Sequence, residues 1–258
     1  MIETATTIAT KTMKACGIAV RPLHDIDDMR LCVDLQRRIW GYAETDIVPD
    51  AMFAVAEHSG GQVLGAEHDG RLVGFALAYA ARRSGVEYLH SHMVGVVPEY
   101  QDRGVGRLLK LAQREDAIAR GINLIEWTFD PLQIKNAHFN LARLGAVIRH
   151  YIPNCYGRTS SPLHAGLPTD RLVAEWWIQS NRVERILGGE VPASRSPQSR
   201  VCVPADMRQI CKDDPPRAEK IQAEVRQQFE TGFAAGRIAV GFELDPQQGC
   251  YVLEPYED

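Results

Sequence analysis

Residues 94–109 read Val94-Gly95-Val96-Val97-Pro98-Glu99-Tyr100-Gln101-Asp102-Arg103-Gly104-Val105-Gly106-Arg107-Leu108-Leu109. An apolar strand runs into a short loop with a proline, and the loop leads into a helix that reaches roughly Arg120. Apolar residues recur along this helix at close to the period of about 3.6 residues that marks one buried face. They are Val105, Leu108, Leu109, Leu111, Ala112, Ile118 and Ala119. The pattern predicts a strand, a loop and an amphipathic helix in succession.

The start of this helix is suited to binding an anion. A helix N-terminus leaves backbone N–H groups without intrahelical partners and carries a partial positive charge. Gly104 and Gly106 remove the side chains that would keep an anion away from these groups, and Arg103 and Arg107 add positive charge. We therefore predict a cradle for a diphosphate, in which backbone donors do most of the binding.

Two other interpretations of the glycines compete with this one. They suit an ordinary strand–loop–helix connection, in which glycine serves only a tight turn. They also suit a dinucleotide-binding fingerprint, because Glu126 lies about 20 residues beyond the first glycine. However, Leu109 stands where the third glycine should be, and the loop around Pro98 separates the strand from the glycines. These two departures disfavour the dinucleotide interpretation.

The stretch from Val97 to Leu109 resembles the acyl-CoA-binding motif of the GCN5-related N-acetyltransferases (GNAT). That motif is Val-x-Pro-x-x-Gln/Arg-x-x-Gly-x-Gly/Ala-x-x-Leu, and the proline, the glutamine, both glycines and the leucine match in order. The resemblance covers roughly Ile18 to Gly157. It implies an α/β (α+β) fold, with a mixed, mostly antiparallel sheet and helices on both faces.

The chain is expected to have three parts. Residues 1–16 are read as a loose leader, residues 17–157 as the acyl-CoA-binding core, and residues 158–258 as an αβ extension packed on the core. The core pattern predicts the order β-α-α-β-β-β-α-β-α-β. In the extension we expect a helix over 214–235 and a closing hairpin over 238–253, which would suit a homodimer.

Composition excludes several function classes. The 258 residues carry a net charge of −4, which argues against a nucleic-acid partner, and no apolar run approaches the length of a membrane span. The six cysteines form no Cys-x-x-Cys pair, so we expect reduced thiols, no metal and a cytoplasmic location. A soluble enzyme fits these features.

The resemblance also implies an acyl-CoA site. The pantetheine arm would bind the backbone of the strand before the loop, in a gap between that strand and the strand after the helix. A backbone N–H there would stabilise the thioester oxygen as it becomes an oxyanion. Asn136 matches an asparagine that touches the cofactor arm, although it would equally serve as a helix cap. The implied cofactor-binding residues are Val94, Gly95, Val96, Gln101, Asp102, Arg103, Gly104, Val105, Gly106, Arg107 and Asn136.

An amine nucleophile must lose a proton before it attacks a thioester, so a general base is expected. Glu126 is a candidate because a charged residue between apolar neighbours in a strand is costly without a partner or a function. His90 and His92 are candidates because the period of about two places them on one face with Val94. We favour Glu126 or His92, acting directly or through a water. A metal at the His-x-His pair is disfavoured, since no third ligand is evident nearby.

The general acid of the family is missing. Many members carry a tyrosine four residues before the Gly-Phe that ends the helix expected here over residues 136–144. Leu141 occupies that place, and Gly145 is followed by Ala146. Tyr151 or Tyr156 would substitute from the next segment, and Tyr156 is the residue that we select. Each tyrosine would equally line the core with a satisfied hydroxyl. Because free thiols ionise near a pKa of about 8.5, an acid is not obligatory.

The extended architecture, including Leu167-Pro168-Thr169-Asp170-Arg171-Leu172, resembles a long acetyltransferase subgroup. Some of its relatives are associated with N-acylation of amino acids, including succinyl transfer to D-amino acids. An arginine would then hold the substrate carboxylate in a bidentate manner. Arg171 is the first candidate, with Arg149 and Arg158 behind it. The alternative for Arg171 is a structural ion pair with Asp170 or Glu175.

These features together predict a CoA-dependent N-acyltransferase. It would move an acetyl or succinyl group from acyl-CoA to an amine of a small molecule, such as an amino acid, by direct attack. Two rivals remain. Cys155 would act as a nucleophile, although no histidine is linked to it in a recognisable pattern. The chain would otherwise be a non-catalytic acyl-CoA sensor, which the missing tyrosine favours.

Overall fold

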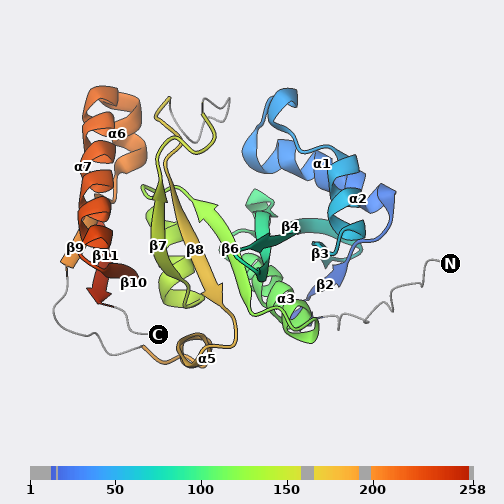
Figure 1. The fold of residues 1–258 in the computed structure, drawn as a ribbon. Coiled ribbons are helices and arrows are strands. Elements are labelled where there is room, and N and C mark those ends of the chain that lie inside the picture. The colour runs from blue at the N-terminus through green and yellow to red at the C-terminus, as the bar shows by residue number, and fades with distance from the viewer. Residues whose placement is uncertain (1–12, 16, 158–165, 192–198, 256–258) are drawn as a thin grey trace. The chain divides into compact units, whose positions relative to one another are not determined.

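The computed structural model describes residues 13–15, 17–157, 166–191 and 199–255. The chain divides into two compact units, Met1–Ile125 and Glu126–Asp258, which are described separately (Figure 1). The core–extension boundary predicted after residue 157 stays a prediction.

The first unit is built around antiparallel strands in the order β1-β2-β3-β4-β5. Helices cover both faces of this sheet (Figure 1). A Cβ on Gly95 of β5 would lie 2.7 Å from Trp40 of α1, whereas a Cβ on Gly74 of β4 would lie 3.5 Å from Leu109 of α3. The elements are β1 (Met13–Ala15), β2 (Ile18–Pro22), α1 (Ile26–Trp40), η1 (Glu44–Asp46), α2 (Asp50–His58), β3 (Gln62–His68), β4 (Arg71–Arg83), β5 (Val86–Val96), η2 (Pro98–Tyr100) and α3 (Val105–Ala119).

The predicted loose leader is partly wrong. Met13–Ala15 forms β1 and pairs with β2 in antiparallel register. Residues 1–12 and 16 of the predicted leader lie outside the described residues.

Strand β6 (Leu124–Phe129) begins in the first unit and continues into the second. The sheet of the second unit has the order β6-β8-β7-β10-β11-β9. The remaining elements are α4 (Ile134–His138), the π-helix η3 (Phe139–Arg143), β7 (Val147–Ile152), β8 (Arg171–Trp177), α5 (Asn181–Leu187), β9 (Ser199–Pro204), α6 (Met207–Asp213), α7 (Pro215–Ala234), β10 (Arg237–Leu244) and β11 (Gln248–Pro255). From β2 to β7 the strands and α-helices follow the predicted core order, and the predicted mixed, mostly antiparallel α/β fold is confirmed.

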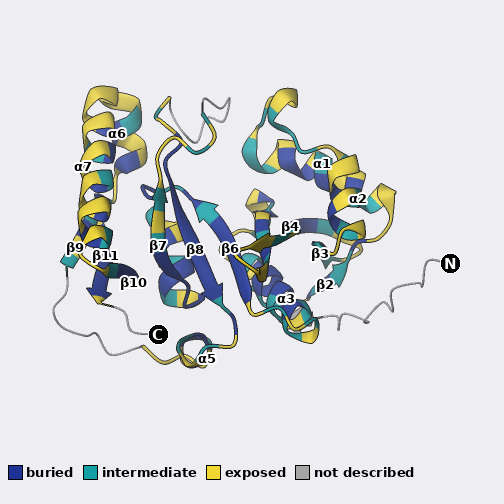
Figure 2. Cartoon of the chain, viewed as in Figure 1, coloured by how far each residue is buried: buried dark blue, intermediate teal, exposed yellow. Residues whose placement is uncertain are grey.

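The C-terminal extension adds to the sheet of the second unit. Strand β8 lies between β6 and β7 in the sheet order and is buried along nearly its whole length (Figure 2). Helix α7 packs against β7, β9 and β10, and its Phe229 meets Tyr251 of β11 edge-on with ring centroids 4.9 Å apart. The predicted helix and closing hairpin are present, whereas α6 was not predicted. No helix in the described part of the chain is both long and apolar enough to span a membrane.

The expectation of reduced thiols is wrong for one pair of cysteines. Strands β9 and β11 run antiparallel, and their register places Cys202 directly opposite Cys250, where the two form a disulfide. The pair is 48 residues apart in sequence, so no local spacing signalled it. Cys32, Cys155 and Cys211 are free thiols. The predicted cytoplasmic location stays a prediction, and it loses the support of fully reduced cysteines.

Thiol labelling tests this disulfide. In denaturant without reductant, we expect Cys32, Cys155 and Cys211 to react with the label, whereas Cys202 and Cys250 should react only after reduction because they are joined. We expect reduction to cost up to about 4 kcal/mol of stability, since the bond closes a long loop. Calorimetry with and without reductant would show this loss as a lower Tm. A control variant, Cys211→Ser, should keep the same redox shift, and labelling of all six thiols before reduction would contradict the pairing.

Candidate active site

The loop between β5 and α3 has the backbone geometry of an anion cradle. Asp102 and Gly104 both adopt positive φ angles, +57° and +80° respectively. Left-handed residues within a turn are typical of the concave backbone nests that bind anions. Gly104 is the N-cap residue of α3, and the position makes no side-chain capping bond. A φ of +80° is strained for any residue with a Cβ, so the conformation explains why glycine stands here.

Backbone donors gather at this helix end. The first intrahelical bond of α3 is donated by the Leu108 N–H to the Gly104 carbonyl, at 3.0 Å. The amides of Val105, Gly106 and Arg107 precede it and therefore have no i−4 partner within the helix. A Cβ on Gly106 would meet nothing closer than Val96 at 4.0 Å, so glycine is not needed there for packing inside the protein. Its bare backbone suits an external ligand.

Two side chains flank the cradle. The Arg103 guanidinium carbon lies 5.1 Å from the centre of the Tyr100 ring, which holds positive charge beside the loop. Tyr100 is itself fixed by a bond between its hydroxyl and Nδ1 of His68, at 2.9 Å. The Gln101 side chain turns back toward β5, where its Nε2 donates to the Val96 carbonyl at 2.9 Å.

The three residues predicted to bind pantetheine, Val94, Gly95 and Val96, differ in the direction in which their peptide groups point. Val97 donates to Val73 of β4 at 3.0 Å, and the two residues lie directly opposite each other. In an antiparallel pair every second residue bonds the same neighbour, so the peptide groups of Gly95 face β4 and those of Val94 and Val96 face away from it. Packing explains the glycine at position 95 instead, because a Cβ there would lie 2.7 Å from Trp40.

A β-bulge overturns the predicted face of the histidines. Met93 pairs with Leu77 and Ser91 pairs with Ala78, which leaves His92 as the extra residue in β5. Ser91 bonds Lys110 of α3, and Val94 pairs with Ala76 on the same side as Gly74, which faces α3. His90 pairs with Tyr79, on the other side of the sheet. The two histidines therefore do not share a face with Val94.

His90 and His92 nevertheless lie together. Their ring centroids are 6.2 Å apart, and the His92 ring lies 5.7 Å from Tyr79. Burial, followed by the charges of His92, Lys110 and Arg83, lowers the pKa of His90 to about 4. Burial also lowers the pKa of His92. Both imidazoles are therefore neutral near pH 7 and able to accept a proton. Among the described residues, no three metal-ligating side chains gather at one place.

A buried lysine behind this strand was not predicted. Lys110 of α3 is 3% exposed and donates to Ser91 Oγ at 2.8 Å, and Ser91 donates to Gln113 at 3.0 Å. Burial lowers the pKa of Lys110 well below its ordinary value. The signal was available, since Lys110 follows directly on the apolar pair of residues 108 and 109 that marks the buried face of the helix.

The second unit holds the other predicted residues. Glu126 lies on β6 and is only 2% exposed. Asn136 is exposed in the first turn of α4, whose N-cap residue is Gln133, so Asn136 is not the helix cap that the alternative required. Leu141, which occupies the place of the family's tyrosine in the resemblance, is fully buried within the π-helix η3.

The two tyrosine candidates differ in their surroundings. The Tyr151 hydroxyl donates to Asp170 Oδ2 at 2.6 Å, and burial together with this carboxylate raises the Tyr151 pKa. Tyr156 is 47% exposed, and its hydroxyl lies 2.7 Å from Thr128 Oγ1 on β6. Tyr156 is thus the more accessible proton donor.

The two carboxylates that the structural alternative named as partners of Arg171 each bind another arginine. The Asp170 carboxylate binds Arg226, and the Glu175 carboxylate binds Arg149. Arg171 donates to the Asp170 carbonyl at 2.8 Å, and its guanidinium carbon lies 5.3 Å from the centre of the Tyr156 ring. Its charge also acts on Asp130. Burial raises the pKa of Asp130 above its ordinary value, and the positive charge of Arg171 opposes part of this rise. Arg158 lies outside the described residues.

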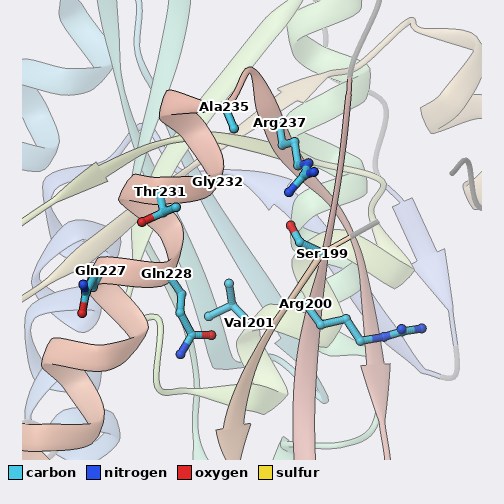
Figure 3. A pocket seen from close by; sticks show the side chains of 9 residues that line it. All are labelled: Ser199, Arg200, Val201, Gln227, Gln228, Thr231, Gly232, Ala235 and Arg237. Carbon is cyan, nitrogen blue, oxygen red and sulfur yellow. The ribbon is translucent and has the colours of Figure 1, made fainter. Parts of the chain in front are cut away.

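A cavity of about 350 Å³ lies elsewhere in the second unit, between α7 and strands β9 and β10 (Figure 3). It contains none of the predicted site residues. Arg237 and Ser199 point toward each other across it (Figure 3). Its lining residues are Ser199, Arg200, Val201, Gln227, Gln228, Thr231, Gly232, Ala235 and Arg237.

The fold and the cradle together define an acetyltransferase-like protein. Residues 29–145 match the sequence model of the Acetyltransferase (GNAT) family. A search among curated proteins found no match.

Solved structures share this fold. A GNAT-family structure from Desulfovibrio desulfuricans aligns with a TM-score of 0.51 and 15% identity, covering 62% of this chain and 99% of that chain. The ribosomal-protein-S18-alanine N-acetyltransferase from Escherichia coli aligns with a TM-score of 0.51 and 15% identity, covering 63% of this chain and 95% of that chain. At this identity the likeness establishes the fold, and the part of our chain left uncovered is consistent with a C-terminal extension.

Proposed function

We propose that the chain transfers an acetyl or succinyl group from acyl-CoA to the amine of a small molecule. The observation that carries the proposal is the glycine cradle at the start of α3, where the amides of Val105, Gly106 and Arg107 precede the first helical bond. Backbone amides at a helix N-terminus bind phosphates well. The amides of the family motif would hold the diphosphate of coenzyme A, and the outward peptide groups of Val94 and Val96 would hold pantetheine. The exposed Asn136 would contact the cofactor arm.

The reaction would be a direct transfer. A base, Glu126 or His92, removes a proton from the substrate ammonium, and the amine nitrogen then attacks the thioester carbon. The new C–N bond forms, the C–S bond breaks, and Tyr156 gives its proton to the leaving thiolate. The new amide nitrogen then loses its second proton, which restores Tyr156. A neutral His92 is ready to accept the proton, and the exposed Tyr156 is accessible to donate one. In this mechanism Cys155 is a free thiol that takes no part in the chemistry.

Thiol release tests this function. Acetyl-CoA and succinyl-CoA are offered separately with a panel of amines, comprising D- and L-amino acids, their amides, polyamines and a peptide with an N-terminal alanine. We expect amine-dependent release of CoA thiol with one donor and with a free small amine. Silence across the panel with retained CoA binding would favour the sensor, for which the buried Leu141 at the family's tyrosine position is the specific motive. Release with the peptide alone would replace the small-molecule acceptor by a protein.

Arg171 is the proposed ligand of a substrate carboxylate. Its guanidinium lies beside the exposed Tyr156. We expect Arg171→Ala to lower kcat/KM for a free amino acid by about 100-fold, the value of a bidentate charged contact, and to affect the corresponding amide far less. Steady-state kinetics on the two substrates measure the difference. Equal losses on the acid and the amide would dismiss the clamp.

A further inference from the structure

One buried carboxylate connects the C-terminal helix to the predicted acceptor residues. Asp170 is fully buried in the second unit. Arg226 of α7 holds it in a bidentate manner, with Nε at 2.9 Å from Oδ2 and Nη2 at 2.9 Å from Oδ1. Tyr151 donates to the same carboxylate at 2.6 Å. A buried carboxylate is stable only with such donors, so Arg226 is the cation on which Asp170 depends.

The same carboxylate fixes the segment that carries Tyr156. Asp170 Oδ1 accepts the Asn154 N–H at 2.9 Å. Asn154 has a φ of +44°, which is uncommon for a residue with a side chain and needs support from its surroundings. The neighbouring Thr169 continues the contact, because its carbonyl accepts the Cys155 N–H and its Oγ1 accepts the Tyr156 N–H, both at 2.9 Å.

Arg171 depends on the same point of the backbone. It follows Asp170 directly and donates to the Asp170 carbonyl at 2.8 Å, while its guanidinium lies over the Tyr156 ring. Helix α7 adds a second bond here, from Gln222 Nε2 to the Pro168 carbonyl at 2.9 Å. Residues 168–171 are thus held by α7, and residues 154–156 are held by residues 169 and 170.

We propose that Arg226 is a positioning residue for acceptor binding: through Asp170 it sets the backbone that carries Tyr156 and Arg171. The C-terminal extension would then be part of the acceptor side of the enzyme. This inference rests on the proposed function for its kinetic consequence, but its structural consequence can be measured without any turnover.

The experiment compares Arg226→Met with Arg226→Lys and with a matched control, Arg200→Met. Arg200 also forms an ion pair within the extension, with Glu243 at 3.1 Å, but it does not touch Asp170. The first readout is hydrogen–deuterium exchange of the full chain. We expect amides 154–156 to exchange at least ~10-fold faster in Arg226→Met, because their bonds depend on the Asp170 position. Peptides from α3 should be unchanged, the lysine variant should recover part of the protection, and Arg200→Met should resemble the wild type.

The second readout is kinetic. We expect Arg226→Met to raise the KM for the amine by at least ~10-fold and to leave the KM for acyl-CoA within about 2-fold, since displaced Tyr156 and Arg171 would misplace the acceptor. If Arg226→Met does not fold, Tyr151→Phe removes a single bond to Asp170, and it should show the same two effects in smaller size.

The outcomes separate this inference from the proposed function. Unchanged exchange at amides 154–156 overturns the inference, whatever the activity. Faster exchange with equal changes in both KM values also overturns it, because the role would then be only structural. A wild type without thiol release on any amine would overturn the proposed function, while the exchange result would still decide whether Arg226 positions the segment.

Discussion

Gly106→Asp is expected to raise the Kd for acetyl-CoA at least ~100-fold while leaving the Tm unchanged or higher. Gly106 lies in the first turn of α3, and its amide is among those that precede the first helical bond. An aspartate there puts a like charge against the diphosphate and covers the bare backbone. The protein itself should tolerate the change, because a Cβ has room and a carboxylate in the first turn of a helix is stabilising by about 0.3–1 kcal/mol.

This test is specific because the substitution should weaken binding of acetyl-CoA without lowering the Tm. Isothermal titration calorimetry gives the Kd and scanning calorimetry gives the Tm. Gly106→Asn is the matched control, because asparagine has the same shape without the charge and should lose less affinity. Equal affinity for the wild type and Gly106→Asp would mean that the diphosphate binds elsewhere.

Glu126→Gln is expected to lower kcat by about 100-fold or more, the usual contribution of a general base, and to keep the Kd for acetyl-CoA within about 2-fold. The substitution keeps the shape of the side chain and removes its capacity to accept the substrate proton. Glu126 is 2% exposed, so loss of a buried carboxylate must be separated from loss of catalysis. Stopped-flow and steady-state kinetics, together with calorimetry, separate the two effects.

Glu175→Gln is the matched control for this variant. Glu175 is a buried carboxylate of the same unit, 5% exposed, with Arg149 as its partner. It should lose stability without a comparable loss of kcat. Unchanged turnover in Glu126→Gln would remove Glu126 from the mechanism and leave His92 as the base to be tested by His92→Gln.

Much of the fold was predictable from local sequence patterns. The pattern of apolar, turn and capping residues along the core was sufficient to predict the order from β2 to β7. The cradle followed from the same patterns, because helix N-termini and glycines have local physical consequences. Gly104 was predicted to leave the backbone bare, and the structure adds that it has a positive φ.

Features that depend on register or long-range contact were not predictable. The bulge at His92 adds one residue to β5, and the sequence pattern of that strand does not indicate it. Cys202 and Cys250 meet because β9 and β11 pair, and Arg226 reaches Asp170 from 56 residues away. Such contacts are set by the packing of distant elements. The absence of the family tyrosine stays a prediction from the sequence, and Leu141 at that place is fully buried.

The central claim is that the backbone amides at the start of α3 bind the diphosphate of coenzyme A. Titration of ¹⁵N-labelled protein with CoA, followed by amide resonances, tests this most directly. We expect the signals of Gly104, Val105 and Gly106 to shift in a saturable way and their protons to become protected from exchange. Saturable shifts confined to other residues, with these three unmoved, would contradict the account.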